Sequence, residues 1–150
     1  MNPGLFVCYN GFGDSMERIE KQLKFILEID KEKQIKRKTL QSNGKDFEDD
    51  AQHAWHIAIM TLLLNEYANE EIDVLKTISM LLIHDLVEID ADDTYAYDSQ
   101  GLKTQSTREA MAANRIFNLL PEDQAKKMFD LWNEFEERKT PEAKFARVMD

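Results

Sequence analysis

The dipeptide His84-Asp85 lies at the end of an apolar run, MLLI, and several further carboxylates follow it closely. An ionised carboxylate next to a buried segment is costly unless it is paired with a cation or bound to a metal. Glu88 follows His84 by one helical turn, so the two side chains would share a face. A metal lowers the pKa of bound water, and a nearby carboxylate can orient that water or accept its proton. The segment therefore predicts half of a hydrolytic metal site.

Further ligands would have to come from other helices. The chain has three histidines and one cysteine, Cys8, so a cysteine-rich zinc site is excluded. His53 is the first choice, because it shares an apolar helical face with Ile57 and Met60. His56 is better interpreted as a residue of the helix surface or core rim. A histidine in an apolar helix is more often a satisfied core residue than a ligand, so this pattern alone is weak.

Composition limits the partners of the protein. Its 150 residues carry 19 basic and 29 acidic side chains, a formal charge of −10, which disfavours duplex nucleic acid. A phosphorylated ligand would need a local cation to offset that charge. The chain has no apolar run of about 18 residues and no signal-peptide pattern at its start. Together with the single cysteine, these features predict a cytoplasmic protein without a membrane partner.

The predicted fold class is all-α, a single-domain bundle of about six helices. No segment alternates apolar and polar residues as a half-buried strand would. Residues 1–15 are expected to form a flexible extension, because NGFGD contains two glycines and no periodic face. A first helix follows from Met16 and decays in KEKQIKRK. The segment TLQSNGKDFEDD is predicted to be a loop, and a second helix begins near Asp50.

The third predicted helix begins after Asp73 and continues through LLIHDLVE; it is apolar nearly all round, as expected of a central helix. A loop, TYAYDSQGLK, separates it from a fourth helix, for which Ser106 and Glu109 form a possible capping box. Pro121 and Pro141 begin the fifth and sixth helices, since proline is favoured in the first helical turn.

Three segments carry a family resemblance: EDDAQHAWHIA, MLLIHDLVEIDADDT and LWNEFEERKTPEAKFARVMD. Their order and spacing resemble the HD-domain phosphohydrolases, in particular a bacterial branch similar to 5′-deoxynucleotidases. The resemblance extends from about Met16 to the end of the chain. It implies one divalent metal ion held by His53, His84, Asp85 and Asp150. Two histidines and two carboxylates suit Mn, Co, Zn, Fe or Ni, with Mg also open.

The same resemblance implies roles for four other residues. Glu88 would orient or deprotonate the attacking water, and Asp93 would assist the leaving oxygen. Arg37 would hold the phosphate, and Thr94 is expected to bind substrate as well. The implied substrate is a deoxyribonucleoside 5′-monophosphate. Two alternatives stay open, namely hydrolysis of another nucleotide (cyclic, triphosphate or alarmone) and a non-catalytic nucleotide-binding helical module.

Four departures from the family pattern bear on these roles. Gln52 stands where related sequences usually have glutamate, which removes a charge near His53. Asp92 stands where they often have glycine, and Lys38 where some have an aromatic residue that helps to select the sugar. The family's chain also normally continues with further helices after the last metal aspartate, so we expect C-terminal helices of the family to be missing after Asp150.

Relatives in this family are often homodimers. The predicted fifth helix contains Phe129, Trp132 and Phe135, which could form an apolar seam between two copies. The alternative is that these aromatic side chains simply pack in the core.

Overall fold

The computed structural model describes residues 11–91 and 102–150, most of which are helical. The predicted all-α class is confirmed, with one small two-stranded sheet added to it. The η elements are short 3₁₀ helices. In chain order the elements are α1 (Gly11–Ile29), η1 (Asp30–Gln34), β1 (Lys36–Leu40), β2 (Phe47–Asp49), α2 (Asp50–Leu64), η2 (Asn65–Tyr67), α3 (Val74–Ile83), η3 (His84–Val87), α4 (Glu88–Ala91), α5 (Leu102–Phe117), α6 (Glu122–Glu137) and α7 (Pro141–Met149).

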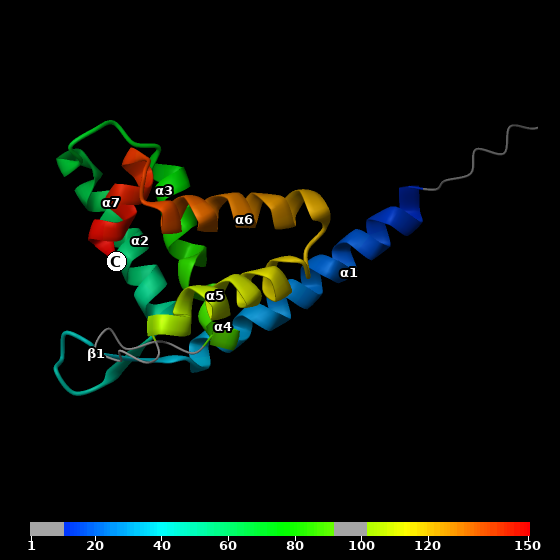
Figure 1. Cartoon of the computed structure of the whole chain (residues 1–150), viewed down its shortest axis with the longest axis horizontal. Helices are drawn as coiled ribbons and strands as arrows, with labels where there is room; N and C mark the ends of the chain where they lie inside the picture. The colour runs from blue at the N-terminus through cyan, green and yellow to red at the C-terminus, as the bar shows by residue number, and fades with distance from the viewer. Residues whose placement is uncertain (1–10, 92–101) are drawn as a thin grey trace, which may run out of the picture.

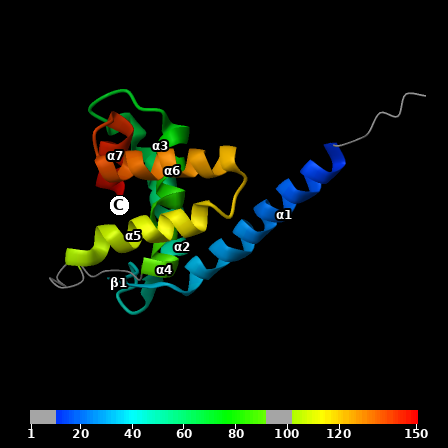
Figure 2. The ribbon, with the colours of Figure 1, turned by 45° about the vertical axis from the view of Figure 1, so that its right-hand side comes forward.

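Helix α1 is long, and its N-terminal half projects away from the other helices (Figures 1 and 2). It begins at Gly11, so residues 11–15 are helical and do not belong to the predicted flexible extension. Once a helix is nucleated, each added residue costs little, so the helix can extend beyond its predicted start at Met16. Residues 1–10 lie outside the described part of the chain.

The segment predicted to be a loop forms an antiparallel hairpin instead. Strands β1 and β2 pair with Lys36 opposite Asp49 and Leu40 opposite Phe47. The turn between them includes Gly44, whose φ of 67° suits glycine. Strand β1 is almost entirely exposed and polar, so it lacks the alternating pattern that would have predicted it. The hairpin carries the chain from η1 to the start of α2.

Helix α2 begins with a reciprocal capping box. The Asp49 carboxylate accepts a hydrogen bond from the Gln52 backbone N–H at 2.9 Å, and the Gln52 side-chain oxygen accepts one from the Asp49 N–H at 3.3 Å. This fixes where the helix starts and therefore which side chains face inward. His53 and Ile57 are buried, whereas His56 is exposed, as its sequence interpretation suggested.

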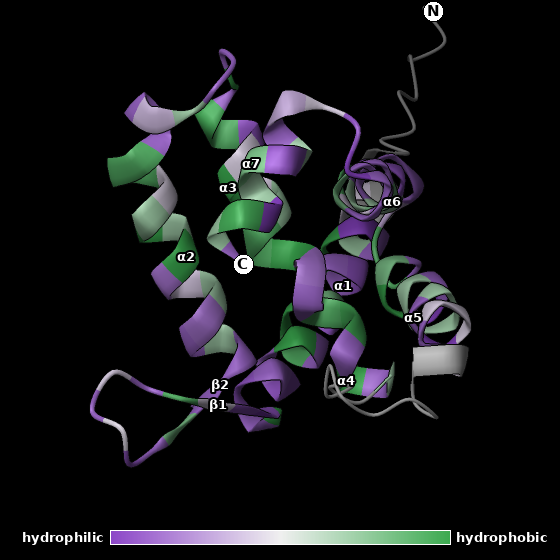
Figure 3. Cartoon of the chain, turned by 60° about the vertical axis from the view of Figure 1, so that its left-hand side comes forward, coloured by the Kyte–Doolittle hydropathy of each residue, from purple (hydrophilic) through white to green (hydrophobic). Residues whose placement is uncertain are grey.

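The predicted third helix is divided into α3, η3 and α4. Met80 and Leu81 are fully buried, but Leu75 is 75% exposed, so α3 is not enclosed on every side. The chain tightens into a 3₁₀ turn at His84, which often marks a functional position in a helix. Figure 3 shows the hydrophobic stretch of α3 in the middle of the bundle, beside α7.

Helices α5, α6 and α7 complete the bundle. Ser106 lies inside α5, which starts at Leu102, so the predicted capping box at Ser106 does not begin this helix. Helix α7 begins as predicted, with the Thr140 hydroxyl accepting a hydrogen bond from the Ala143 N–H at 3.2 Å. Figure 1 shows the end of α7 close to α2.

The aromatic residues of α6 pack inside this chain. Trp132 is 8% exposed and Phe135 is 1% exposed, and Phe129 packs against the larger core cluster. Packing in the core, the alternative interpretation, therefore accounts for Trp132 and Phe135, whereas Phe129 is half-buried against the core. Among the described residues, no helix is both long enough and apolar enough to span a membrane.

Candidate metal centre

Three elements that are distant in sequence bring His53, His84 and Asp150 together. His53 lies in the first turn of α2, His84 opens η3, and Asp150 follows the last residue of α7. One ligand atom from each residue lies within 4.8 Å of the other two. The two histidines are buried, and the Asp150 side chain is 11% exposed. The His53 side chain is similarly 10% exposed and that of His84 is 3% exposed, so the group is largely enclosed.

The spacing of the ligand atoms fits a single ion. The Asp150 Oδ1 atom is 3.0 Å from His53 Nε2 and 3.3 Å from His84 Nε2. The Asp85 Oδ2 atom is 3.1 Å from His84 Nε2, so the fourth predicted ligand adjoins the group. Ligands placed about 2.1 Å from one ion, at angles between octahedral and tetrahedral, are separated by about 3.0–3.4 Å. The donor set therefore has the size and chemistry of one transition-metal site.

Both histidines are held so that Nε2 faces the group. Nδ1 of His53 lies 3.3 Å from the Glu48 carboxylate, and Nδ1 of His84 lies 2.9 Å from the Leu81 carbonyl oxygen. Such contacts select the tautomer with a proton on Nδ1 and leave Nε2 to bind metal. Glu48 was not predicted from the sequence. Its only sequence signal is an acidic residue five positions before His53, which is uninformative without the hairpin.

Gln52 is the residue before His53 that departs from the family pattern, and its side chain makes its hydrogen bonds away from His53. Its side-chain oxygen accepts a hydrogen bond from Gln41 at 2.9 Å in addition to its role in the capping box. The residue is exposed. The carboxylate beside His53 therefore comes from Glu48, one strand earlier, and the lost charge at position 52 does not leave His53 without an acidic neighbour.

Arg37 reaches the edge of the group from β1. Its Nη1 atom lies 2.5 Å from Asp85 Oδ2 and 3.2 Å from Asp50 Oδ1, and its Nη2 atom lies 4.0 Å from Asp150 Oδ1. Burial opposes its charge, but Asp85 and Asp50 raise the pKa of Arg37 above its ordinary value. A permanent cation thus stands beside the candidate ligands, an arrangement that can attract an anion.

The carboxylates and histidines of the group stabilise one another in their charged forms. Burial alone would lower the pKa of His84, but Asp85 and Asp150 raise it to about 10. Burial alone would raise the pKa of Asp150, but the hydrogen bonds from His53 and His84 lower it below its ordinary value. Both aspartates are therefore ionised near neutral pH, and a metal must displace a proton from His84 in order to bind there.

Glu88 opens α4 and is buried beside the group. Together with His84 and Asp85 it lines a cavity of about 80 Å³, which also includes Glu109 and Arg147. This volume holds a few water molecules. The predicted residues Asp93 and Thr94, and the departure Asp92, lie outside the described residues.

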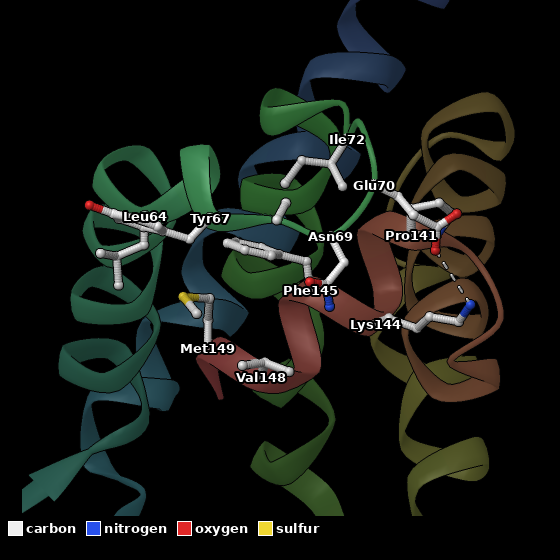
Figure 4. Close-up of a pocket in the computed structure, with 11 residues that line it drawn as sticks. Leu64, Tyr67, Asn69, Glu70, Ile72, Pro141, Lys144, Phe145, Val148 and Met149 are labelled. Carbon is white, nitrogen blue, oxygen red and sulfur yellow. Dashed lines mark ion pairs between the residues drawn. The ribbon is translucent and has the colours of Figure 1, made fainter.

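A larger cavity of about 290 Å³ lies elsewhere, between the C-terminal end of α2 and α7. In Figure 4, Leu64, Phe145 and Met149 surround it, and an ion pair between Lys144 and Glu70 lies at one side. None of the predicted site residues lines this cavity. It is mainly apolar and separate from the metal group.

A helical bundle that brings two histidines and one aspartate together, with a second aspartate beside His84, defines a candidate metal-binding helical domain. A family model described as HD domain matches residues 29–150, and the chain belongs to that family. A crystal structure of a predicted metal-dependent phosphohydrolase from Magnetospirillum magnetotacticum is similar, with a TM-score of 0.83 and 47% identity. That match covers 89% of this chain and 66% of the other.

Other relatives are more distant. A conserved hypothetical protein from Pyrococcus furiosus has a TM-score of 0.67 and 27% identity, covering 85% of this chain and 71% of that one. A 5′-deoxynucleotidase HDDC2 from Bos taurus is 30% identical over 65% of this chain, and one from Dictyostelium discoideum is 31% identical over 85%. These matches cover 46% and 70% of the two relatives. The chain spans about half the length of the mammalian relatives it matches.

Proposed function

We propose that this chain is a metal-dependent phosphohydrolase that acts on a nucleotide phosphomonoester. The observation that carries the proposal is the 3.0–3.3 Å spacing of His53, His84 and Asp150 atoms, with the Arg37 guanidinium beside them. A cation and a neighbouring arginine explain how a protein of charge −10 accepts an anionic substrate. The similarity to a predicted metal-dependent phosphohydrolase supports the same reading.

In this proposal His53, His84, Asp85 and Asp150 hold one divalent ion, which is Mn, Co, Zn, Fe, Ni or Mg. When bound, such an ion supplies positive charge for the phosphate and lowers the pKa of a water molecule. Arg37 holds the phosphate through its N–H donors.

Glu88 orients the attacking water or accepts its proton, from the cavity that it shares with His84. Asp93 assists the leaving oxygen, and Thr94 contributes to substrate binding. These two roles rest on the family resemblance.

The proposed substrate is a deoxyribonucleoside 5′-monophosphate, in line with the relatives named 5′-deoxynucleotidase. We further propose that residues 16–150 form the HD domain, and that the protein is cytoplasmic and homodimeric. Sedimentation velocity tests the homodimer, and a single species of monomer mass would contradict it. The exposed apolar side chains of α1 are a candidate contact surface: Met16, Ile19, Leu23, Ile26 and Leu27.

The test of the activity is phosphate release from deoxyribo- and ribonucleoside monophosphates with added Mn²⁺ or Co²⁺. Asp85→Ala should abolish both turnover and metal binding, whereas Glu88→Ala should keep the metal and lose turnover. Glu66→Ala, a change at an exposed acidic residue of η2, is the matched control and should behave as wild type. If wild type releases no phosphate but binds nucleotide, the non-catalytic module is the better description.

A further inference from the structure

Asp50 is a charged residue at a fully buried position. It is 0% exposed and is the first residue of α2. Its backbone N–H donates to the Ile35 carbonyl oxygen at 3.2 Å, so the base of the hairpin fixes its place. A buried carboxylate is costly unless a partner compensates its charge. The reason for an acidic residue here must therefore lie in its contacts.

Capping of α2 does not account for Asp50. The preceding residue, Asp49, already provides the N-cap, since its carboxylate accepts the Gln52 N–H. The Asp50 Oδ1 atom instead lies 3.2 Å from Nη1 of Arg37. The two residues come from different elements, β1 and α2, and the hairpin register brings them together. The buried Asp50 carboxylate is thus paired with the Arg37 guanidinium.

Asp50 differs from the other two carboxylates that contact Arg37 in the described part of the chain. Asp150 belongs to the candidate metal group and Asp85 adjoins it as the fourth predicted ligand, so a bound cation would interact with the negative charge of both. Asp50 is not one of the candidate metal ligands. Its contact with the guanidinium does not compete with metal coordination.

We propose that Asp50 is a positioning residue, which holds the Arg37 guanidinium at the edge of the metal group and leaves its other N–H donors for the phosphate. An arginine side chain has five N–H donors, so one contact with Asp50 does not exhaust them. This inference rests on the proposed function, because it assigns Asp50 a part in binding the same phosphate.

The test compares Asp50→Asn with Asp49→Asn, which makes the same chemical change one residue earlier and keeps a good N-cap. For Asp50→Asn we expect KM to rise about tenfold while kcat changes less than about threefold, because a misplaced clamp weakens binding. Asp49→Asn should match wild type. In an Arg37→Ala background, Asp50→Asn should have no further effect on KM, since the residue it positions is gone.

Two measurements separate this inference from the proposed function. Metal content should be the same in Asp50→Asn and wild type, and calorimetry with the Mn²⁺-loaded proteins measures binding of inorganic phosphate. If Arg37→Ala weakens phosphate binding but Asp50→Asn does not, the inference is overturned while the activity stands. Weaker phosphate binding in Asp50→Asn, in a protein without turnover, would support the inference and overturn the activity. A wild-type protein that neither binds nor releases phosphate overturns both.

Asp50→Asn could fail to fold, since the residue is buried beside a cation, and circular dichroism would detect this. In that case Asp50→Glu replaces it, because this variant keeps the charge and displaces the guanidinium by one methylene. A rise in KM smaller than that of Arg37→Ala supports the inference, and an unchanged KM contradicts it.

Discussion

At the scale of single residues, the metal group depends on side chains that do not belong to it. Glu48 lies 3.3 Å from Nδ1 of His53, which turns the opposite nitrogen toward Asp150. Outer partners of this kind fix the ring and raise the basicity of a histidine ligand. A site described by its ligands alone would therefore omit part of what determines metal affinity.

We predict that Glu48→Gln weakens metal binding about 10–100-fold, because the amide orients His53 less strongly than the carboxylate does. Competition with a chelating dye measures this affinity. Glu66→Gln is the matched control, since Glu66 is exposed on η2. Equal affinities for the two variants would show that Glu48 does not support the site.

Glu32 is a second acidic residue whose environment is unusual. It is 8% exposed, and burial together with the charges of Asp85 and Asp50 raises its pKa from 4.5 to about 7, which His84 partly offsets. Between these two values the folded protein holds a proton that the unfolded chain releases. The free energy of unfolding therefore falls as pH rises from about 4.5 to about 7.

We predict that Glu32→Gln removes this part of the pH dependence in metal-free protein. Above pH 7 the variant should be more stable than wild type by up to about 3 kcal/mol. Urea unfolding at several pH values measures the difference, and Glu20→Gln on the exposed surface of α1 is the control. Parallel pH profiles for wild type and Glu32→Gln would contradict the prediction.

At the scale of elements, the ends of helices position the site. The capping box of Asp49 and Gln52 sets the start of α2 and hence the direction of His53. The 3₁₀ turn η3 tightens the chain where His84 and Asp85 occur, so that two adjacent residues both reach the group. Both features are local, but their consequence is the orientation of ligands.

We predict that Asp49→Ala lowers the free energy of unfolding by about 1 kcal/mol, because the first turn of α2 loses its side-chain acceptor. Asp49→Asn should cost much less, since asparagine is also a good N-cap. Thermal unfolding measures both variants. If alanine and asparagine are equally tolerated, the capping box does not hold the helix start.

At the level of the whole molecule, helix α6 packs against the metal group through its contact with His84. The Phe135 ring of α6 lies 4.9 Å from the His84 ring, and its outer side faces the Arg147 guanidinium at 5.7 Å. Phe135 belongs to the core cluster that joins α3 and α7, the helices that lead to His84 and Asp150. One aromatic side chain thus links the packing of the bundle to the geometry of two ligands.

We predict that Phe135→Leu destabilises the protein and also weakens metal binding, since the smaller side chain leaves space behind His84. The cost in free energy of unfolding should be about 1–3 kcal/mol, below that of a full truncation to alanine. Denaturant unfolding and metal titration measure the two effects. An unchanged metal affinity in a destabilised Phe135→Leu would confine its role to the core.

The helical class could be predicted from local patterns in the sequence, and the resemblance of three segments to a family supplied the full set of candidate ligands. Helical periodicity and caps are local, so the inward face of His53 and the start of α7 at Pro141 could be predicted from neighbouring residues. The order of the motifs selected His84, Asp85 and Asp150, which the structure brings together. The hairpin was missed because its strands are short, polar and exposed.

The surroundings of those ligands depend on contacts between elements that are distant in the sequence. The contact of Glu48 with His53 and that of Asp50 with Arg37 follow from the hairpin and the strand register, which no local periodicity encodes. Similarly, burial of Trp132 and Phe135 follows from packing against other helices. Periodicity says which way a side chain points from its own helix, but the partner it meets depends on how distant elements pack.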